Sequence, residues 1–295
     1  MRVIQMTKWL QLKAMFLAGA LLVCFLTSGY AAVEQDGGMA ADSVGEKYSV
    51  SVDGVVEYTA FDVDGTAYVP LRSFCKSLGV GAVVTQSGAP RTMTVRFDDP
   101  AVQGRSCRLQ ARVGDFYLTV NDRVVYLAAD ILYRGGNVLV PMEGLCAAFG
   151  IIPRAEGQGW MLDTDSMTVC ADGTAVYDAD DLKWLSHIIH AEAGNQSLVG
   201  QICVGNVVLN RVRDSRFPDT VEAVIFSPNQ FCPVRSGSIW STPDEEAVIA
   251  AKLCLEGVSF AGQSTYFVNP VTGSTRWFTE HLTYAMTVGD HDFYY

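Results

Sequence analysis

The sequence of 295 residues is poor in basic side chains, because 21 lysines and arginines stand against 32 aspartates and glutamates. The net charge at pH 7 is −11, and no cluster of Lys and Arg interrupts the acidic background. Such a chain would repel a polyanion, so nucleic acid is excluded as a partner. Affinity for a large ligand such as a carbohydrate polymer would have to come from hydrogen bonds and aromatic stacking.

The cysteines lack any C-x-x-C spacing, which argues against a zinc ribbon and a redox motif. Of the eight cysteines, Cys24 lies in the apolar run near the N-terminus, and the seven others cannot all pair. Most have apolar neighbours, as Cys203 has in QICVG and Cys254 in KLCLEG. We predict buried thiols, with one or two disulfides as the main alternative. The seven are Cys75, Cys107, Cys146, Cys170, Cys203, Cys232 and Cys254.

The apolar run from Ala14 to Leu26 is shorter than the roughly 20 residues that a membrane-spanning helix needs. Three cations precede it, and small residues follow it around Gly29–Ala32. This layout predicts a secretory signal peptide over residues 1–31 and an exported mature protein, with an uncleaved anchor as the alternative.

The remaining chain divides by composition and by hydrophobic period. Short alternating runs with Asp-Gly, Gly and Pro turns predict β structure from Tyr48, whereas the period becomes helical after an acidic, turn-rich stretch. The prediction is a two-domain α+β protein, in which a β-rich repeat domain precedes a mostly helical domain with a small sheet. The predicted parts are a flexible leader (32–47), the β-rich domain (48–170), a linker (171–181) and the helical domain (182–295).

The β-rich domain contains an internal repeat. Tyr68–Val80 (YVPLRSFCKSLGV) recurs as Leu139–Ile151 (LVPMEGLCAAFGI), each as a strand end, a Pro at a first helical position, a short helix and a terminating Gly. A hairpin-like stretch precedes each copy, and we expect the two copies to stack on each other. The YVPLR segment, with the DGTA turn before it, resembles the copper amine oxidase N-terminal-like domain over residues 48–166. No His or Cys cluster with metal-ligand spacing occurs there, so the resemblance implies a positioning or wall-interaction module, without copper.

The helical domain is expected to contain four helices and two strands. Asp180 or Asp181 is expected to cap the first helix, and Thr242, Pro243 and Glu245 to form a capping box at the fourth. The expected helices are 182–193, 198–212, 218–226 and one that ends at Gly257, and the expected strands are 264–268 and 283–288.

Glu192 stands at the end of the apolar helix LKWLSHIIHAEAG, directly before the Gly that ends it. Partial desolvation and the negative end of the helix dipole would both raise the pKa of its carboxyl group. A general acid that delivers a proton to a glycosidic oxygen near neutral pH needs this shift. The competing interpretation is an exposed glutamate at a helix end.

Several sequence blocks occur together in register: HIIHAEAGNQS, GQICVGNVVLNRVRDSRFPDTVEAVIFSPNQF, STYFVNP and TVGDHDFY. They resemble the cell wall hydrolase family typified by spore-cortex-lytic enzymes, over residues 183–295. The resemblance implies a lysozyme-like fold and cleavage between N-acetylmuramic acid and N-acetylglucosamine, commonly as a lytic transglycosylase, with Glu192 of the AEA motif as the catalytic residue. It implies peptidoglycan glycan strands as the partner and a wall-associated or secreted location, without choosing between spore cortex and vegetative wall.

Further positions are candidates for substrate binding. Many relatives have Glu where this sequence has Gln196, and loss of that carboxylate favours release of an anhydro sugar over hydrolysis. Asp290 or Asp292 is the alternative second acid. The substrate-binding candidates are Gln196, Gln230, Phe231, Tyr266 and Asn269, and Trp277 is a weaker one. For all of them except Gln196, packing in the core is the alternative. Asn210, Arg211 and His291 are expected to be structural.

Three alternatives remain. His187, His190 and Glu192 form an H-x-x-H-x-E string, but helical spacing places Glu192 well around the helix from His190, so no metal site and no cofactor is expected. Cys232 and His281 lack a nucleophile motif that would support a peptidase. The main rival from another class is a non-catalytic wall protein in which both domains bind peptidoglycan.

Overall fold

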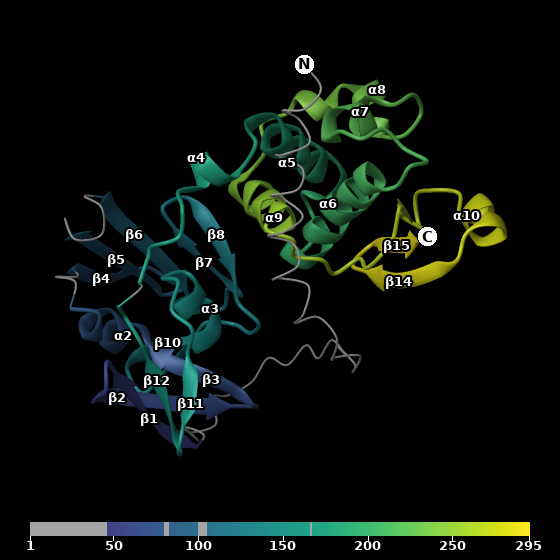
Figure 1. The fold of residues 1–295 in the computed structure, drawn as a ribbon. Helices are drawn as coiled ribbons and strands as arrows, with labels where there is room; N and C mark the ends of the chain where they lie inside the picture. Colours follow the sequence, from purple (N-terminus) through teal and green to yellow (C-terminus); the bar gives the residue numbers. More distant parts are fainter. Residues whose placement is uncertain (1–45, 80–82, 100–104, 166) are drawn as a thin grey trace, which may run out of the picture. The chain divides into compact units, whose positions relative to one another are not determined.

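A computed structural model describes residues 46–79, 83–99, 105–165 and 167–295 (Figure 1). The predicted signal peptide and all but the last two residues of the predicted leader lie outside the described residues. Within the described ranges, no helix has the length and apolar character needed to cross a membrane.

The N-terminal region is β-rich, as its alternating pattern predicts. Its larger sheet has, among the described residues, seven strands in the order β11-β12-β1-β2-β3-β10-β9. The β1–β12 pair is parallel and the other pairs are antiparallel. The strands are β1 (Lys47–Val52), β2 (Val55–Val63), β3 (Thr66–Pro70), β9 (Leu132–Arg134), β10 (Asn137–Pro141), β11 (Arg154–Glu156) and β12 (Gly159–Leu162).

The two copies of the internal repeat pack against each other. Strand β3 leads into α2 (Leu71–Ser77), and β10 leads into α3 (Met142–Ala147). Strands β3 and β10 pair antiparallel with each other. The ring of Phe74, from the first copy, lies 5.5 Å from the ring of Phe149, from the second copy. The predicted stacking of the copies is therefore confirmed.

One detail of the repeat differs from expectation. Pro70 and Pro141 are the last residues of their strands and the N-caps of the helices, not the first helical residues. Their ψ angles of 115° and 122° are extended, because each proline still belongs to the strand that pairs with the other copy.

A second sheet completes the β-rich region. Within the described residues it is a five-stranded antiparallel meander in the order β4-β5-β6-β7-β8. The β7–β8 hairpin turns through Asn121 and Asp122, both with positive φ, which is the turn that suits strand twist in a two-residue loop. Its strands are β4 (Val83–Ser87), β5 (Thr92–Asp99), β6 (Arg105–Arg112), β7 (Tyr117–Val120) and β8 (Arg123–Tyr126).

The C-terminal region is mostly helical with a small sheet, which agrees with the fold class predicted for it. Its three-stranded antiparallel sheet, counted among the described residues, has the order β13-β15-β14. The elements are α4 (Gly173–Val176), α5 (Ala179–Ala193), α6 (Leu198–Arg213), α7 (Val221–Phe226), α8 (Cys232–Ser236), the 3-10 helix η1 (Ser238–Trp240), α9 (Glu245–Leu255), β13 (Tyr266–Val268), α10 (Arg276–His281), β14 (Tyr284–Val288) and β15 (His291–Tyr294).

The boundaries correct several predictions. The predicted linker contains α4 and the first turn of α5, whose N-cap is Asp178 and not Asp180 or Asp181. Helix α7 begins after the cap residue Thr220 rather than at Pro218, and Asp244 rather than Thr242 caps α9. In each case a side-chain oxygen nearer the helix accepts the free backbone N–H groups. Helices α8 and α10 and strand β15 were not predicted.

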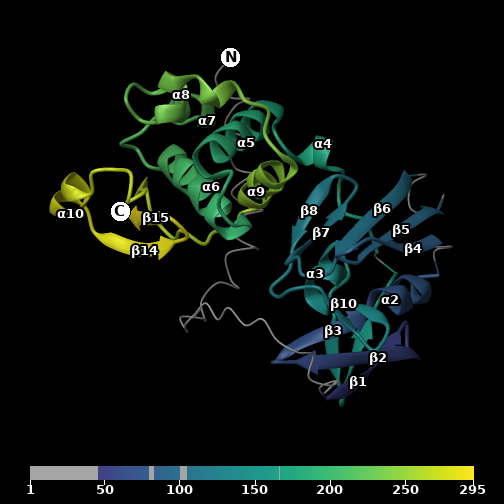
Figure 2. The same cartoon turned by 180° about the vertical axis from the view of Figure 1, so that it is seen from behind.

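Helices α5, α6 and α9 form the core of the helical region and lie side by side in both views (Figures 1 and 2). Gly205 of α6 faces Ile189 of α5 and Cys254 of α9. A Cβ atom there would lie 2.8 Å from a methyl group of Ile189 and 2.7 Å from Sγ of Cys254. The bare glycine backbone therefore allows the three helices to pack, and this packing holds the C-terminal end of α5 in place.

The seven cysteines of the described part are free thiols, in agreement with the main prediction. Burial raises the pKa of Cys75, Cys107, Cys146 and Cys203 to about 12, so these side chains behave as small apolar groups. Cys232 differs from them because it is exposed.

Candidate active site

Glu192 is the penultimate residue of α5 and is partly buried. Burial raises the pKa of its carboxyl group from 4.5 to about 7, and the positive charge of Arg211 opposes that rise. The upward direction agrees with the sequence prediction, and so does desolvation as its cause, whereas the predicted effect of the helix dipole on this pKa stays a prediction. At neutral pH a large fraction of Glu192 therefore holds a proton that it can deliver.

Arg211, near the C-terminal end of α6, is a charged residue that acts electrostatically on Glu192. Its side chain is buried, with 4% of its surface exposed. Its Nε donates to the backbone oxygen of Thr265 at 2.7 Å, and its Nη1 donates to Oε1 of Gln230 at 3.2 Å. Burial lowers the pKa of Arg211 to about 10, while Tyr266 and Glu192 act in the opposite direction.

Three aromatic rings surround the guanidinium group of Arg211. The ring centroids of Phe217, Phe231 and Tyr266 lie 5.2, 5.0 and 5.3 Å from its Cζ. Cation–π attraction of this kind is stronger where water is excluded. The guanidinium group is therefore held by three aromatic rings together with its two hydrogen bonds.

An aromatic row continues from this cage to the surface. The rings of Tyr266 and Trp277 lie 5.8 Å apart, and Trp277 stacks on His281 at 5.3 Å with an interplanar angle of 15°. Trp277, on α10, is 48% exposed. Such a ring beside a partly buried tyrosine suits stacking on a sugar face.

Gln196 joins the start of α6 to the β14–β15 turn. Its Nε2 donates to Oδ2 of Asp290 at 2.9 Å, and its Oε1 accepts from the backbone N–H of Asp290 at 3.0 Å. Gly289 in this turn has a φ of +56°, a left-handed conformation that favours glycine. Both ends of the Gln196 amide thus have partners within the protein, and so does the carboxylate of Asp290.

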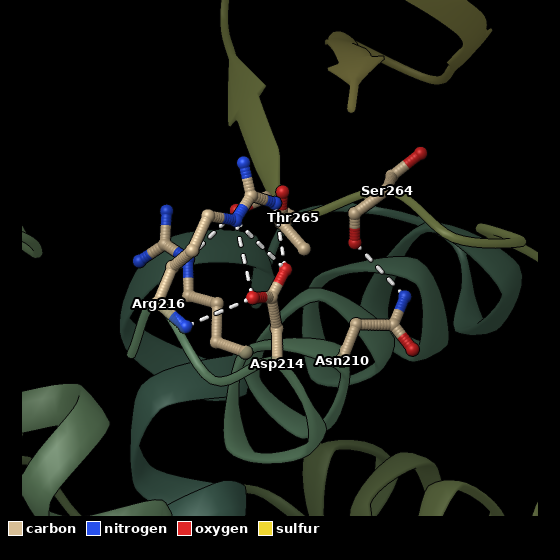
Figure 3. A network of polar contacts seen from close by, with 6 residues as sticks. Asn210, Asp214, Arg216, Ser264 and Thr265 are labelled. Atoms are coloured by element: carbon tan, nitrogen blue, oxygen red, sulfur yellow. Dashed lines mark hydrogen bonds and ion pairs between the residues drawn. The ribbon is translucent and has the colours of Figure 1, made fainter. Parts of the chain in front are cut away.

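Asn210 and Asn269 fix loops near the site. Asn210 donates to the backbone oxygens of Gly262 and Ser264, and Figure 3 shows its contact with Ser264 beside the Asp214–Arg216 ion pair. Asn269 accepts from the backbone N–H groups that follow it, at 2.9 and 3.3 Å. The expected structural role of Asn210 agrees with these contacts.

The histidines of α5 have separate partners. Nδ1 of His187 lies 2.8 Å from the backbone oxygen of Ile239, and Nδ1 of His190 lies 3.2 Å from the carboxylate of Asp244. Across the described ranges, no three His, Cys, Asp or Glu side chains are grouped so as to hold a metal ion. His291 is buried, and burial lowers its pKa.

The structure brings three of the five substrate-binding candidates together around Arg211. Gln230 is a hydrogen-bond partner of Arg211, whereas Phe231 and Tyr266 contribute rings to its cage. Phe231 is only 6% exposed, which favours the packing alternative for it. Gln196 and Asn269 bind other parts of the chain, so their roles toward substrate stay predictions.

Arg211 was expected to be structural, and its contacts with Thr265 and Gln230 agree with that role. Its interaction with Glu192 was not foreseen, because the two residues belong to different helices and no sequence spacing relates them. The one available signal was an arginine within a run of apolar residues on a helix that must be buried.

Two family models match this chain. The model described as Cell Wall Hydrolase matches residues 195–294, and the model described as Copper amine oxidase N-terminal domain matches residues 50–162. Residues 195–294 are thus a cell wall hydrolase domain. Its match begins directly after the helix that carries Glu192, and the second match covers most of the β-rich region.

Curated relatives of the cell wall hydrolase region are spore cortex-lytic enzymes. The chain is 39% identical over 103 residues to the spore cortex-lytic enzyme of Halalkalibacterium halodurans. The matched segment covers 35% of this chain and 31% of that protein. It is 35% identical over 101 residues to the enzyme of Bacillus cereus, covering 34% and 39%. The chain thus spans about a third of the length of the relatives that it matches.

Two solved structures are also similar. One is the catalytic domain of the germination-specific lytic transglycosylase SleB from Bacillus anthracis, with 31% identity, a TM-score of 0.39 and coverage of 43% of this chain and 100% of that one. The other is the catalytic domain of the Bacillus cereus SleB protein, with 32% identity, a TM-score of 0.38 and coverage of 40% and 92%.

Proposed function

We propose that this protein is a peptidoglycan-cleaving glycosidase that cuts the β-1,4 bond between N-acetylmuramic acid and N-acetylglucosamine, with Glu192 as general acid and base. The observation that carries the proposal is the partly buried carboxyl group at the end of α5, whose pKa burial raises to about 7. The cell wall hydrolase domain at residues 195–294 supports the substrate class.

The proposed reaction is that of a lytic transglycosylase. Glu192 gives its proton to the bridging oxygen while the bond from the anomeric carbon to that oxygen breaks, and the bond electrons go to the oxygen. The 6-hydroxyl oxygen of the same muramic acid then bonds to the anomeric carbon. The Glu192 carboxylate takes up the hydroxyl proton, so one carboxyl group serves both steps.

The contacts of the candidate second acids support this route over hydrolysis with two carboxylates. Gln196 stands where many relatives are expected to have Glu, and its amide holds the carboxylate of Asp290. Asp292 accepts a hydrogen bond from Oγ1 of Thr287 at 2.5 Å. Both alternative second acids are thus engaged within the β14–β15 hairpin region.

The test is digestion of purified peptidoglycan sacculi by the full chain. We expect Glu192→Gln to lower the rate of turbidity loss by at least about a hundredfold, because the amide has no proton to deliver. The matched control is Glu222→Gln on α7, an exposed glutamate that should leave the rate unchanged. Mass spectrometry of the wild-type products should show 1,6-anhydro-muramic ends.

Different outcomes contradict different parts of the proposal. Clearing by Glu192→Gln at the wild-type rate would remove Glu192 from the reaction. Products with only reducing-end muramic acid would leave a glycosidase but exclude transglycosylation. No clearing by the wild type, with both forms still bound to sacculi, would favour the rival, a non-catalytic peptidoglycan-binding protein.

We further propose that the protein is exported or wall-associated and that the β-rich region attaches it to the wall. The copper amine oxidase N-terminal domain match over residues 50–162 supports a separate module. To measure this attachment, substitutions in the β-rich region are added to Glu192→Gln. The amount of each protein retained on sacculi is then compared with that of Glu192→Gln alone.

A further inference from the structure

The β-rich region contains a pocket beside the paired strands β3 and β10 of the internal repeat, which we call the β-region pocket. Its volume is about 370 Å³, within the range of roughly 300–1,000 Å³ that small-molecule sites occupy. Its aromatic and polar lining side chains are Tyr48, Asp62, Thr66, Glu143, Gln158 and Trp160. All of its lining residues belong to the β-rich region, so the pocket is formed without the helical region.

Two aromatic rings lie on neighbouring strands of the β-region pocket. Tyr48 belongs to β1 and Trp160 to β12, and the parallel register pairs Val50 with Trp160. Tyr48 is therefore diagonal to Trp160 on the same face of the sheet, because side chains two positions apart point the same way. Both rings pack against the apolar core with one part of their surface and stay partly exposed. They offer adjacent apolar surfaces on which the C–H face of a sugar can stack.

The polar side chains of the β-region pocket are largely unused within the protein. Among the described residues, Thr66, Glu143 and Gln158 form no side-chain hydrogen bond or ion pair. Asp62 uses one oxygen, since its Oδ1 accepts from the backbone N–H of Gly65 at 3.0 Å. The hydroxyl and the amide can each donate and accept, and the two carboxylates can accept. A ligand with hydroxyl and acetamido groups would use all of them.

The charge of the lining restricts the ligand further. Asp62 and Glu143 are acidic, and no Lys, Arg or His occurs among the described residues that line the pocket. A carboxylate or phosphate group on a ligand would be repelled, whereas sugar hydroxyls can donate charge-assisted hydrogen bonds to both carboxylates. An ammonium group would be attracted, but it only donates, so the amide N–H groups of Gln158 and the indole N–H of Trp160 would stay unused. A neutral glycan therefore fits the lining best.

We propose that the β-region pocket binds an N-acetylglucosamine residue of the peptidoglycan glycan strand. The sugar stacks on Tyr48 and Trp160 and donates from its hydroxyl groups to Asp62 and Glu143. This inference rests on the proposed function, because it assigns the proposed wall attachment of the β-rich region to one site. N-acetylmuramic acid is disfavoured here, since the peptides that it carries bear carboxylates, which the acidic lining repels. The pocket thus holds a strand without cleaving it.

The experiment titrates the full chain with Glu192→Gln, here the parent protein, with N,N′,N″-triacetylchitotriose, a soluble trimer of N-acetylglucosamine. Nuclear magnetic resonance follows the indole N–H signal of Trp160, which Trp160→Phe identifies. We expect this signal to shift in the parent protein. Ala155→Phe should raise the dissociation constant by about tenfold or more, because a ring at this small, exposed lining residue occupies the pocket.

Three comparisons supply the controls. Ile152→Phe introduces the same ring at a side chain that is 76% exposed and outside the lining, so it should leave the dissociation constant unchanged. Glu143→Gln removes a charge but keeps an acceptor, and should raise the dissociation constant by about fivefold. Trigalacturonic acid, a trimer with carboxylates, should bind at least about tenfold more weakly than the neutral trimer. Circular dichroism and thermal melting establish that each variant is folded.

Several results would overturn the inference. A Trp160 signal that does not respond to the trimer overturns it, and so does an equal dissociation constant for the parent protein and a folded Ala155→Phe. If Ala155→Phe does not fold, Glu143→Gln decides, and an unchanged dissociation constant then overturns the inference. A response to a free stem peptide with a side-chain amine, without one to the trimer, would make this a peptide site instead.

The failure of this inference can be told apart from the failure of the proposed function. Sacculi that the wild type clears, together with a pocket that does not bind the trimer, would contradict only the inference. Sacculi that Glu192→Gln clears would refute the proposed catalytic role, whatever the titration shows. On sacculi, Ala155→Phe added to Glu192→Gln should be retained less than Ile152→Phe added to Glu192→Gln, and equal retention would remove the pocket from wall attachment.

Discussion

The β-rich region and the helical region bury different kinds of side chain. The core of the β-rich region is apolar, and its largest fully buried side chains include Phe74 and Phe149. In the described part of the chain, every buried polar or charged residue belongs to the helical region. These residues are Ser186, Gln201, Asn206, Arg211, Ser264, Thr265 and His291.

The difference indicates where the protein tolerates unfavourable burial. Polar groups removed from water must be compensated by hydrogen bonds, so a region that keeps many of them has a purpose beyond stability. Asn206 and Arg211 both lie on α6 and tie it to the chain that leads into β13. The described part of the helical region thus contains a core with hydrogen-bonded polar groups, whereas the residues that form the core of the β-rich region are mainly apolar.

The largest expected effect tests the packing of the apolar core in the β-rich region. Phe74→Ala should lower the free energy of unfolding by about 3–5 kcal/mol, because it leaves a cavity in a closely packed apolar core. Denaturant unfolding followed by circular dichroism measures the change. Val56→Ala, at a position that is 70% exposed, is the control, and an equal loss there would contradict the reasoning.

The next effect concerns Glu192 and depends on pH. Its pKa is about 7 in the folded protein and near 4.5 when unfolded, so its contribution to stability is fully present below pH 4.5 and is lost as the pH rises through 7. Glu192→Gln avoids that loss and should exceed the wild type in free energy of unfolding by about 3 kcal/mol at pH 8–9, with little difference at pH 4. Thermal melting across this range, with Glu222→Gln as control, tests it. A constant difference at all pH values would show that Glu192 is not desolvated.

A smaller effect tests the hydrogen bonds inside the helical core. Asn206 donates to the backbone oxygen of Val258 at 2.8 Å and accepts from the N–H groups of Phe260 and Ala261. Asn206→Ala leaves these groups unpaired and should cost about 2 kcal/mol of unfolding free energy. The same replacement at the exposed Gln263 should cost almost nothing, and equal costs would remove the distinction between polar and apolar cores.

The smallest effect concerns the contact between Gln196 and the β14–β15 turn. Gln196→Ala removes both of its hydrogen bonds to Asp290 but should lower the unfolding free energy by about 1 kcal/mol or less, because the site is near the surface. Hydrogen exchange at the Asp290 amide should become faster, while exchange within α6 stays slow. Unchanged exchange at Asp290 would mean that Gln196 does not hold this turn.

Local patterns predicted most elements of the fold. The 3.6-residue period and the capping residues located α5, α6, α7 and α9, with errors of a few residues where a nearer side chain became the cap. The internal repeat predicted that its two copies stack, and the structure adds that they do so through the pairing of β3 with β10. Helices α8 and α10 were missed because they are only five and six residues long and have no clear apolar period.

The candidate site could be predicted only in part. Glu192 followed from its place at a helix end and from the family resemblance. The roles of Gln230, Phe231 and Tyr266 around Arg211 did not follow, because these residues come from segments whose proximity depends on the packing of the chain.

The sequence by itself determined the order of the two regions, the periodicity of their elements and the presence of a carboxyl group where a helix ends, since these depend on neighbouring residues. Only the tertiary structure decided how strongly that carboxyl group holds its proton. Burial and the charge of Arg211 set its pKa, and both arise from side chains distant in the sequence that the packing of α5 against α6 brings near.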